Sequence, residues 1–184
     1  IFVVSFITTC INAQEFSDQS PFKLKLYSGL SLPTGEFGAI SGVEAGFANT
    51  GFFAMMEAVN SVSSSTDLTI SLTVAINGMN DTKMSDLLAP IDVSAGSYYS
   101  TWFLMGLQLG PEPNRNIRFY LSGHLGLMLS SFPDITLKYQ GQSITQTTES
   151  NTALGYGFGC GIQFNKLNVG VRYLFATPEY KQTD

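Results

Sequence analysis

Apolar and small polar residues alternate strictly between Asp67 and Asn77. Leucine, isoleucine and valine occupy the even positions, and threonine, serine, alanine and asparagine occupy the odd ones. Because successive side chains of a strand point to opposite faces, this stretch predicts a strand with one aliphatic and one uncharged polar face. A strand facing bulk water usually carries charged residues. The pattern therefore favours a polar face in a narrow interior and an aliphatic face against lipid.

The same alternation recurs in seven segments, which we expect to be antiparallel strands of one sheet. They are 22–32, 51–62, 67–77, 98–109, 117–130, 152–164 and 167–176. A strand of about 11 residues, with a rise of ~3.3 Å per residue and a tilt of ~40°, spans about 27 Å, close to the apolar band of transmembrane barrels. The sixth segment has four glycines on its polar face. They predict room either where the lumen is tightest or where a bulky side chain arrives from across the barrel.

Long and short connections alternate between these segments. The short ones are 63–66, 110–116 and 165–166. Transmembrane barrels have this asymmetry, with short turns on one side of the membrane and long loops on the other. Within the long connections, 81–88 predicts a helical turn capped by Asp81. The segments 135–139 and 143–148 predict a hairpin that extends the fifth and sixth strands beyond the membrane.

The composition supports a membrane protein without a spanning helix. Charged residues make up 12% of the 184 residues, against roughly 25% in soluble domains. No run of about 18 apolar residues is present, which excludes a spanning helix. A membrane protein that lacks one must be a closed barrel. The net charge of −5 argues against nucleic-acid binding.

Residues 1–13 have the composition of the end of a secretory signal peptide. We expect cleavage after Ala13, which leaves Gln14 first. A lipoprotein signal at Cys10 is the weaker alternative, because threonines stand where small residues usually precede the cysteine. After simple cleavage Cys160 is the one remaining cysteine, so the sequence predicts neither a disulfide nor a cysteine-based metal site.

Three stretches carry a resemblance to a known group of proteins: L-Y-S-G-L-S-L-P-T-G-E-F-G (26–38), T-G-F-F-A-M-M-E (50–57) and L-N-V-G-V-R-Y-L (167–174). With the strand pattern, the chain resembles the small OmpA/OmpX-type barrels of the outer membrane protein beta-barrel domain family. The resemblance covers most of 22–176. It implies an all-β, antiparallel up-and-down transmembrane β-barrel of eight strands, of which seven are clear. We therefore expect 14–184 to be a single barrel domain without its last strand, and the chain to be a fragment.

The resemblance also implies a location and partners. We expect a bacterial outer-membrane protein that contacts the lipid bilayer and lipopolysaccharide, is inserted by the barrel-assembly machinery, is monomeric and needs no cofactor. The expected role is structural or in surface interaction, with a filled polar lumen. A narrow pore or transporter for small or apolar solutes is the alternative.

Six ionisable residues fall on the inward faces of the predicted strands: Lys23, Lys25, Glu57, Arg118, His124 and Arg172. Such charges are costly in a narrow barrel unless they are paired. We expect them to form a structural network that seals the lumen; a gated pore or a proton-sensitive switch using His124 is the alternative. We further expect Glu57 to pair with Arg118, directly or through a lysine, and Arg172 to lie higher and pair elsewhere.

Ser122 and His124 share an inward face, which raises a third hypothesis of a lumen-sited hydrolase. Outer-membrane enzymes that cut lipid A with such a pair present it to the lipid, whereas this pair is expected to face the lumen. No acidic residue lies beside the pair in sequence to orient the histidine. The sequence contains no phosphate-binding loop and no metal-ligand cluster. We therefore expect no enzymatic activity.

Overall fold

The computed structural model describes residues 2–11, 22–42, 45–111, 117–147, 150–164 and 167–178, with 2–11 described by backbone alone. The barrel strands are β1 (Phe2–Ile11), β2 (Phe22–Thr34), β3 (Gly51–Ser61), β4 (Thr66–Gly78), β6 (Ser97–Leu109), β7 (Ile117–Ser131), β10 (Ser150–Phe164) and β11 (Leu167–Ala176). The other elements are η1 (Gly35–Gly38), α1 (Asp81–Leu88), β5 (Asp92–Ala95), β8 (Ile135–Tyr139) and β9 (Gln142–Gln146). No helix among the described residues is long and apolar enough to cross a membrane.

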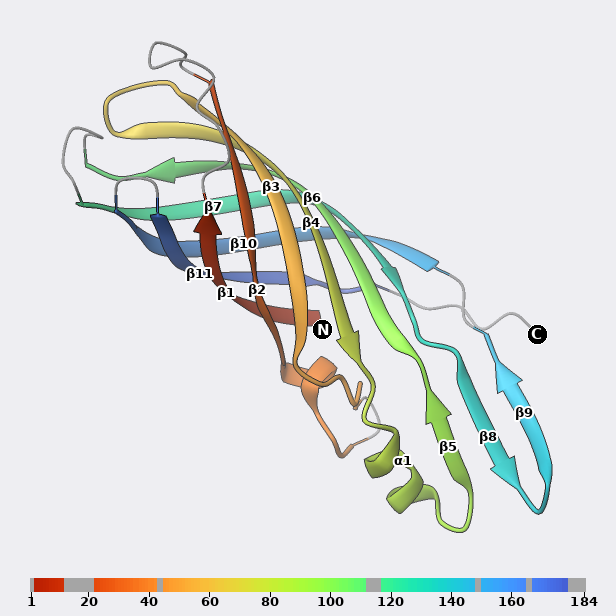
Figure 1. Cartoon of the computed structure of the whole chain (residues 1–184). Coiled ribbons are helices and arrows are strands. Elements are labelled where there is room, and N and C mark those ends of the chain that lie inside the picture. The colour runs from red at the N-terminus through yellow and green to blue at the C-terminus, as the bar shows by residue number, and fades with distance from the viewer. Residues whose placement is uncertain are drawn as a thin grey trace.

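The barrel strands form a strongly curled antiparallel sheet (Figure 1). The hydrogen-bonded order is β1-β11-β10-β7-β6-β4-β3-β2, and β1 closes the barrel by pairing with β2 as well as with β11. The all-β antiparallel architecture predicted from the sequence is confirmed. The seven alternating segments correspond to seven of these strands, β2, β3, β4, β6, β7, β10 and β11.

The predicted count of seven strands is too low for this barrel. Phe2–Ile11, which we interpreted as the end of a signal peptide, lies as β1 between β2 and β11. An apolar segment with interspersed serine and threonine suits a strand as well as a signal, since both require few charges. The pairing does not test whether 1–13 is removed, so the signal peptide stays a prediction. Identifying the first residue of the protein isolated from cells would test it.

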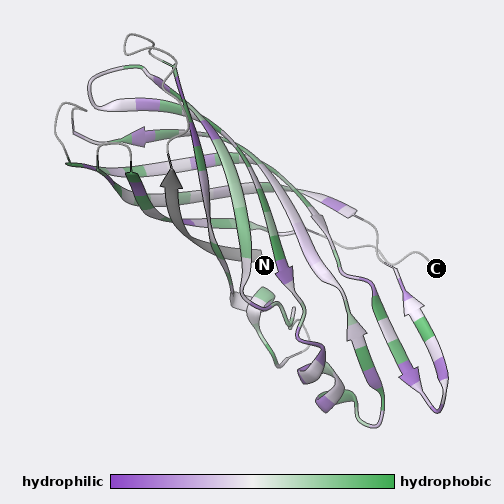
Figure 2. Cartoon of the chain, viewed as in Figure 1, coloured by the Kyte–Doolittle hydropathy of each residue, from purple (hydrophilic) through white to green (hydrophobic). Residues whose placement is uncertain are grey.

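The predicted inward and outward faces of the seven strands are confirmed except at Lys23, which was expected to face inward and is exposed. In β4, Ile70 and Val74 are exposed on the outer wall, whereas Ser71 and Thr73 are buried inside. In β7, the apolar Leu125 is exposed in the same way. The barrel thus has an apolar exterior, and its interior holds polar and charged side chains as well as apolar ones. Figure 2 shows hydrophobic residues along the barrel strands and several hydrophilic ones in α1 and in the β8–β9 hairpin.

The half of the interior nearer the long connections is packed with apolar side chains. Among the described residues, the most deeply buried large ones are Trp102, Leu104, Met128 and Leu174, each at most 1% exposed. Together with other buried residues, among them Phe37, Phe53 and Tyr98, they form one hydrophobic cluster. We call this cluster the apolar half of the interior.

The glycine face of β10 makes room for bulky side chains, as predicted. A Cβ atom at Gly155 would lie 2.9 Å from Cζ3 of Trp102, and one at Gly161 would collide with the Tyr120 hydroxyl. Tyr120 comes from β7, the strand next to β10, and Trp102 comes from β6, one strand further on. Glycine here supplies space in a narrow lumen rather than backbone flexibility.

Beyond the barrel, β5, β8 and β9 form a second sheet that projects as an arm (Figure 1). The predicted hairpin is confirmed, with Gln140 and Gly141 at positive φ in its turn. The pairing of β5 with β8 was not expected from the sequence. The helix is confirmed, but the predicted Asp81 cap is wrong. Asn80 caps it, with Oδ1 accepting a hydrogen bond from the Lys83 backbone N–H at 3.1 Å.

Candidate functional site: a charged network in the barrel interior

A buried ion pair joins two strands near the middle of the barrel. Arg172 Nη2 lies 2.6 Å from Glu57 Oε1, and the side chains are 9% and 1% exposed. The second carboxylate oxygen of Glu57 accepts a hydrogen bond from the Tyr27 hydroxyl at 3.0 Å. Each oxygen of the carboxylate therefore has its own donor, one from Arg172 and one from Tyr27, which offsets part of the cost of burying it.

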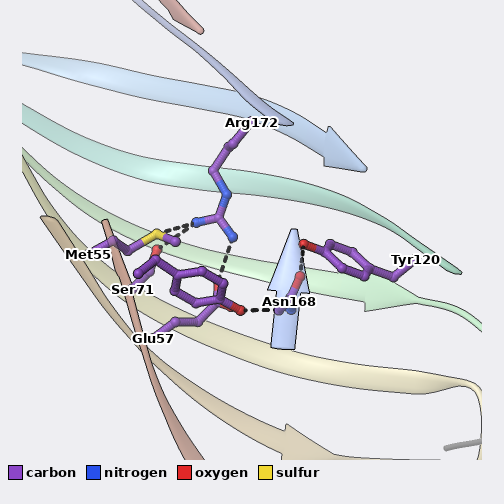
Figure 3. Close-up of polar contacts among 7 residues, drawn as sticks. Met55, Glu57, Ser71, Tyr120, Asn168 and Arg172 are labelled. Atoms are coloured by element: carbon purple, nitrogen blue, oxygen red, sulfur yellow. Dashed lines mark hydrogen bonds and ion pairs between the residues drawn. The ribbon is translucent and has the colours of Figure 1, made fainter. Parts of the chain in front are cut away.

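Further contacts extend this pair into a network (Figure 3). Arg172 Nη1 donates to Met55 Sδ at 2.9 Å and to Ser71 Oγ at 3.5 Å. On the other side, Asn168 Nδ2 donates to the Tyr27 hydroxyl at 3.3 Å, and Tyr120 donates to Asn168 Oδ1 at 2.9 Å. The network connects β2, β3, β4, β7 and β11 across the lumen. Such a cross-braced interior favours one fixed arrangement of the strands.

A second buried ion pair lies closer to the short connections. Arg118 Nη1 is 2.8 Å from Asp67 Oδ2, and the side chains are 7% and 2% exposed. Ser61 donates to the other oxygen of Asp67 at 2.8 Å. Asp67 was absent from our set of candidate residues. Its odd position in the alternating stretch of β4 was the signal that would have placed it inward.

The predicted pairing of Glu57 with Arg118 is wrong. Glu57 pairs with Arg172, which we expected to pair elsewhere, and Arg118 pairs with Asp67. Lys25 is buried and lies directly opposite Glu57 in the register of β2 and β3. Lys23, expected to face inward, is exposed near the start of β2. The two buried ion pairs thus contain three of the predicted charges, Glu57, Arg118 and Arg172, together with Asp67, which was missed. Lys25 lies beside the first pair.

His124 is buried, 6% exposed, and packs across Gly106. Neither ring nitrogen has a hydrogen-bond partner among the described residues, and the same is true of Ser122 Oγ. A serine nucleophile needs a hydrogen-bonded base, so Ser122 and His124 lack the geometry of a catalytic pair here. Within the described ranges no group of three acidic, histidine or cysteine residues lies close enough to hold a metal.

Comparison of the chain with protein-family models, with curated protein sequences and with solved structures finds no match. The resemblance to the OmpA/OmpX-type barrels therefore stays a prediction from the sequence.

Proposed function

We propose that this chain is an integral β-barrel of a bacterial outer membrane, with a filled lumen and a structural or surface-interaction role. The observation that supports this proposal most directly is the distribution of charged residues between the outer and inner faces of the strands. The outward positions of the seven barrel strands from β2 to β11 carry no Asp, Glu, Lys or Arg. Five charged residues are buried inside instead: Lys25, Glu57, Asp67, Arg118 and Arg172.

The energetics of a bilayer account for this sorting. A cationic residue on the lipid face near the midplane costs about 2–4 kcal/mol, whereas apolar side chains there are favourable. The exterior offers large apolar side chains at most outward positions, including Phe119, Leu125 and Val171. In water such a continuous apolar wall would drive association. The partners that fit it are the lipid bilayer and lipopolysaccharide, and its insertion would require the barrel-assembly machinery.

Labelling from the membrane tests the sidedness of β7. In a variant without Cys10 and Cys160, single cysteines at Leu125 and Ser122 are exposed to a thiol-reactive probe dissolved in the bilayer. We expect strong labelling of L125C and weak labelling of S122C. Cys160, which is exposed on the outer wall, serves as a positive control in the otherwise unchanged protein. Equal labelling, or stronger labelling at position 122, would contradict the proposal.

A narrow pore is the second candidate, and buried polar atoms without partners in the lumen favour it. Against it stand the two buried ion pairs and the apolar half of the interior, which together fill much of the lumen. Conductance of the full chain in planar bilayers separates the two functions. We expect a silent bilayer; stepwise conductance would favour the pore.

A further inference from the structure

The strand β1 (Phe2–Ile11) closes the barrel, but its sequence does not alternate as the other barrel strands do. Its backbone lies between β2 and β11 and pairs antiparallel with both (Figure 1). The register aligns Thr9 with Val169, which is exposed on the outer wall, and Thr8 with Gly170, which is buried. Polar residues of β1 therefore fall in an outward row as well as in an inward one. We call the place between β2 and β11 the closing position.

Two residues of β1 align with inward rows of its neighbours but have no hydrogen-bonding groups in their side chains. The register aligns Phe6 with Arg172 of β11 and with Ser31 of β2, both of which are buried. It aligns Val4 with the next inward residue of β11, Leu174. Phenylalanine and valine have no side-chain donor or acceptor, so neither residue can satisfy a polar group in any rotamer.

The wall across the lumen from the closing position contains polar atoms without partners. Among the described residues, the buried side-chain nitrogen and oxygen atoms that lack a hydrogen-bond partner all belong to β4, β6 and β7. In the closed order β6 is four strands from β1 in either direction, so these strands lie across the lumen from β1. The residues concerned are Thr69, Thr73, Gln108, Arg118, Ser122 and His124.

These unsatisfied atoms indicate what kind of strand would suit the closing position. Buried polar groups are almost always hydrogen-bonded, because an unmet group loses its water without replacement. The interior of an eight-stranded barrel is just wide enough for side chains to fill. Long polar side chains that point inward from the closing position can therefore reach the opposite wall and bond to it.

In a membrane the closing position has to be filled, so this inference rests on the proposed membrane barrel. Unpaired backbone groups along β2 and β11 would find no water in the hydrocarbon core. Residues 1–13 have the composition of a signal peptide, and their removal would expose both edges. Main-chain hydrogen bonds do not depend on the side chains, so a different strand can form the same ladders.

We propose that the closing position binds a strand of a partner polypeptide in place of β1. The bound strand runs antiparallel to β2 and β11, as β1 does. Its outward side chains are apolar, matching the exposed Leu30 and Val171 on either side. Its inward side chains are long, polar and uncharged, since a further buried charge would need its own partner. Glutamine fits best, because its amide both donates and accepts.

The test follows the uptake of synthetic peptides, as long as β1, while the full chain folds in detergent. A sorted peptide alternates leucine with glutamine, and a block peptide joins the same amino acids as one apolar and one polar run. Each carries one cysteine in place of a central leucine. The chain lacks Cys10 and Cys160 and carries Val171→Cys on β11, and a short thiol cross-linker joins the two cysteines. We expect a saturable one-to-one adduct with the sorted peptide.

Leu125→Cys is the matched control for the position of uptake. Leu125 is also exposed on the outer wall, but its strand β7 is paired on both sides, with β6 and β10. We expect no adduct there. A third peptide has the sequence of Phe2–Ile11, with cysteine in place of Ile7 and serine in place of Cys10. We expect half-saturation at about tenfold higher concentration than for the sorted peptide, as for the loss of about one hydrogen bond.

Three results would overturn the proposal. They are an adduct at Val171→Cys no larger than at Leu125→Cys, equal uptake of the block and sorted peptides, and uptake of the β1 peptide at least as strong as that of the sorted one. Should Val171→Cys fail to fold, Leu30→Cys on β2 replaces it, because Leu30 aligns with the same position of β1. Labelling of L125C from the bilayer does not involve the closing position, so the membrane barrel can stand while this proposal fails.

Discussion

The two halves of the barrel interior are stabilised by different forces. Towards the short connections, Arg118 and Asp67 form one ion pair, and near the middle Arg172 and Glu57 form another. Towards the long connections, Trp102 and its apolar neighbours pack against one another. The polar half depends on each charge keeping its partner, whereas the apolar half depends on shape.

This difference decides how each half responds to damage. Removing one member of a buried ion pair leaves a charge that no water can solvate. Removing an apolar side chain leaves a void, whose cost depends on how far its neighbours relax. The variants below separate these responses, in order of decreasing effect on stability.

The largest effect is expected for Glu57→Gln. The change leaves Arg172 without its carboxylate, at a cost of about 3–5 kcal/mol in the free energy of unfolding. Urea titration of the chain folded in detergent or lipid measures it. Adding Arg172→Met to this variant should recover much of the loss, because an apolar replacement of a whole buried pair is often tolerated. A single variant within about 1 kcal/mol of the unaltered protein would show that the pair is unimportant.

Trp102→Ala probes the apolar half. Trp102 is fully buried over Gly155, and its truncation should cost about 3–4 kcal/mol. The void should also weaken the seal of the lumen, so bilayer recordings of this variant should show brief openings that the unaltered chain lacks. Unchanged silence would mean that the polar half seals the lumen by itself.

Gly161→Ala tests the space that β10 leaves for Tyr120. The added methyl collides with the Tyr120 hydroxyl, and overpacking of this kind costs about 1–3 kcal/mol. Gly123→Ala is the matched control, because nothing lies within 4 Å of its Cβ position on the outer face of β7. Equal stability of the two variants in urea would refute a size match inside the barrel.

The smallest effect on the barrel is expected from Asn80→Ala, which touches neither half. Loss of this cap should cost α1 about 1 kcal/mol. The Lys83 amide donates a hydrogen bond to the Asn80 side chain. Its hydrogen exchange should therefore become faster in the variant. The urea midpoint of the barrel should not change; a shift would mean that the arm and the barrel unfold together.

The faces of the strands were predictable from sequence because they depend only on the alternation within each segment. The identities of the ion pairs were not. Glu57 on β3 and Arg172 on β11 are separated by two strands of the closed barrel, β2 and β1, and their meeting depends on the stagger of all the strands. No local pattern encodes that stagger. The meeting of these two residues also depends on β1 (Phe2–Ile11), which closes the barrel between β2 and β11. The apolar character of this segment fitted a signal peptide equally well.

Three other features were not predicted from the sequence, each for a local reason. Asp67 was overlooked because it stands at the end of its strand beside a short turn, although its parity was inward. The strand β5 contains four residues, too few for an alternation to be recognised. Asn80 and Asp81 are both good capping residues, and the choice between them depends on backbone geometry.

The glycine run of β10 has a consequence for how the barrel reaches its register. If β10 slipped by two residues along β7, every apolar side chain would still point outward, so alternation alone cannot reject the error. A slip in one direction places Gln163, instead of Gly161, opposite Tyr120. A slip in the other places Ala153, instead of Gly155, beneath the Trp102 ring.

The rings of Tyr120 and Trp102 therefore exclude a shift of β10 in either direction, because each shifted register places a side chain where there is room only for a hydrogen atom. During assembly, β10 would pair stably with β7 only in the register that avoids both clashes. The fit between glycines and aromatic rings inside the lumen thus selects the register of β10 against β7, which the alternation of apolar and polar residues leaves undetermined.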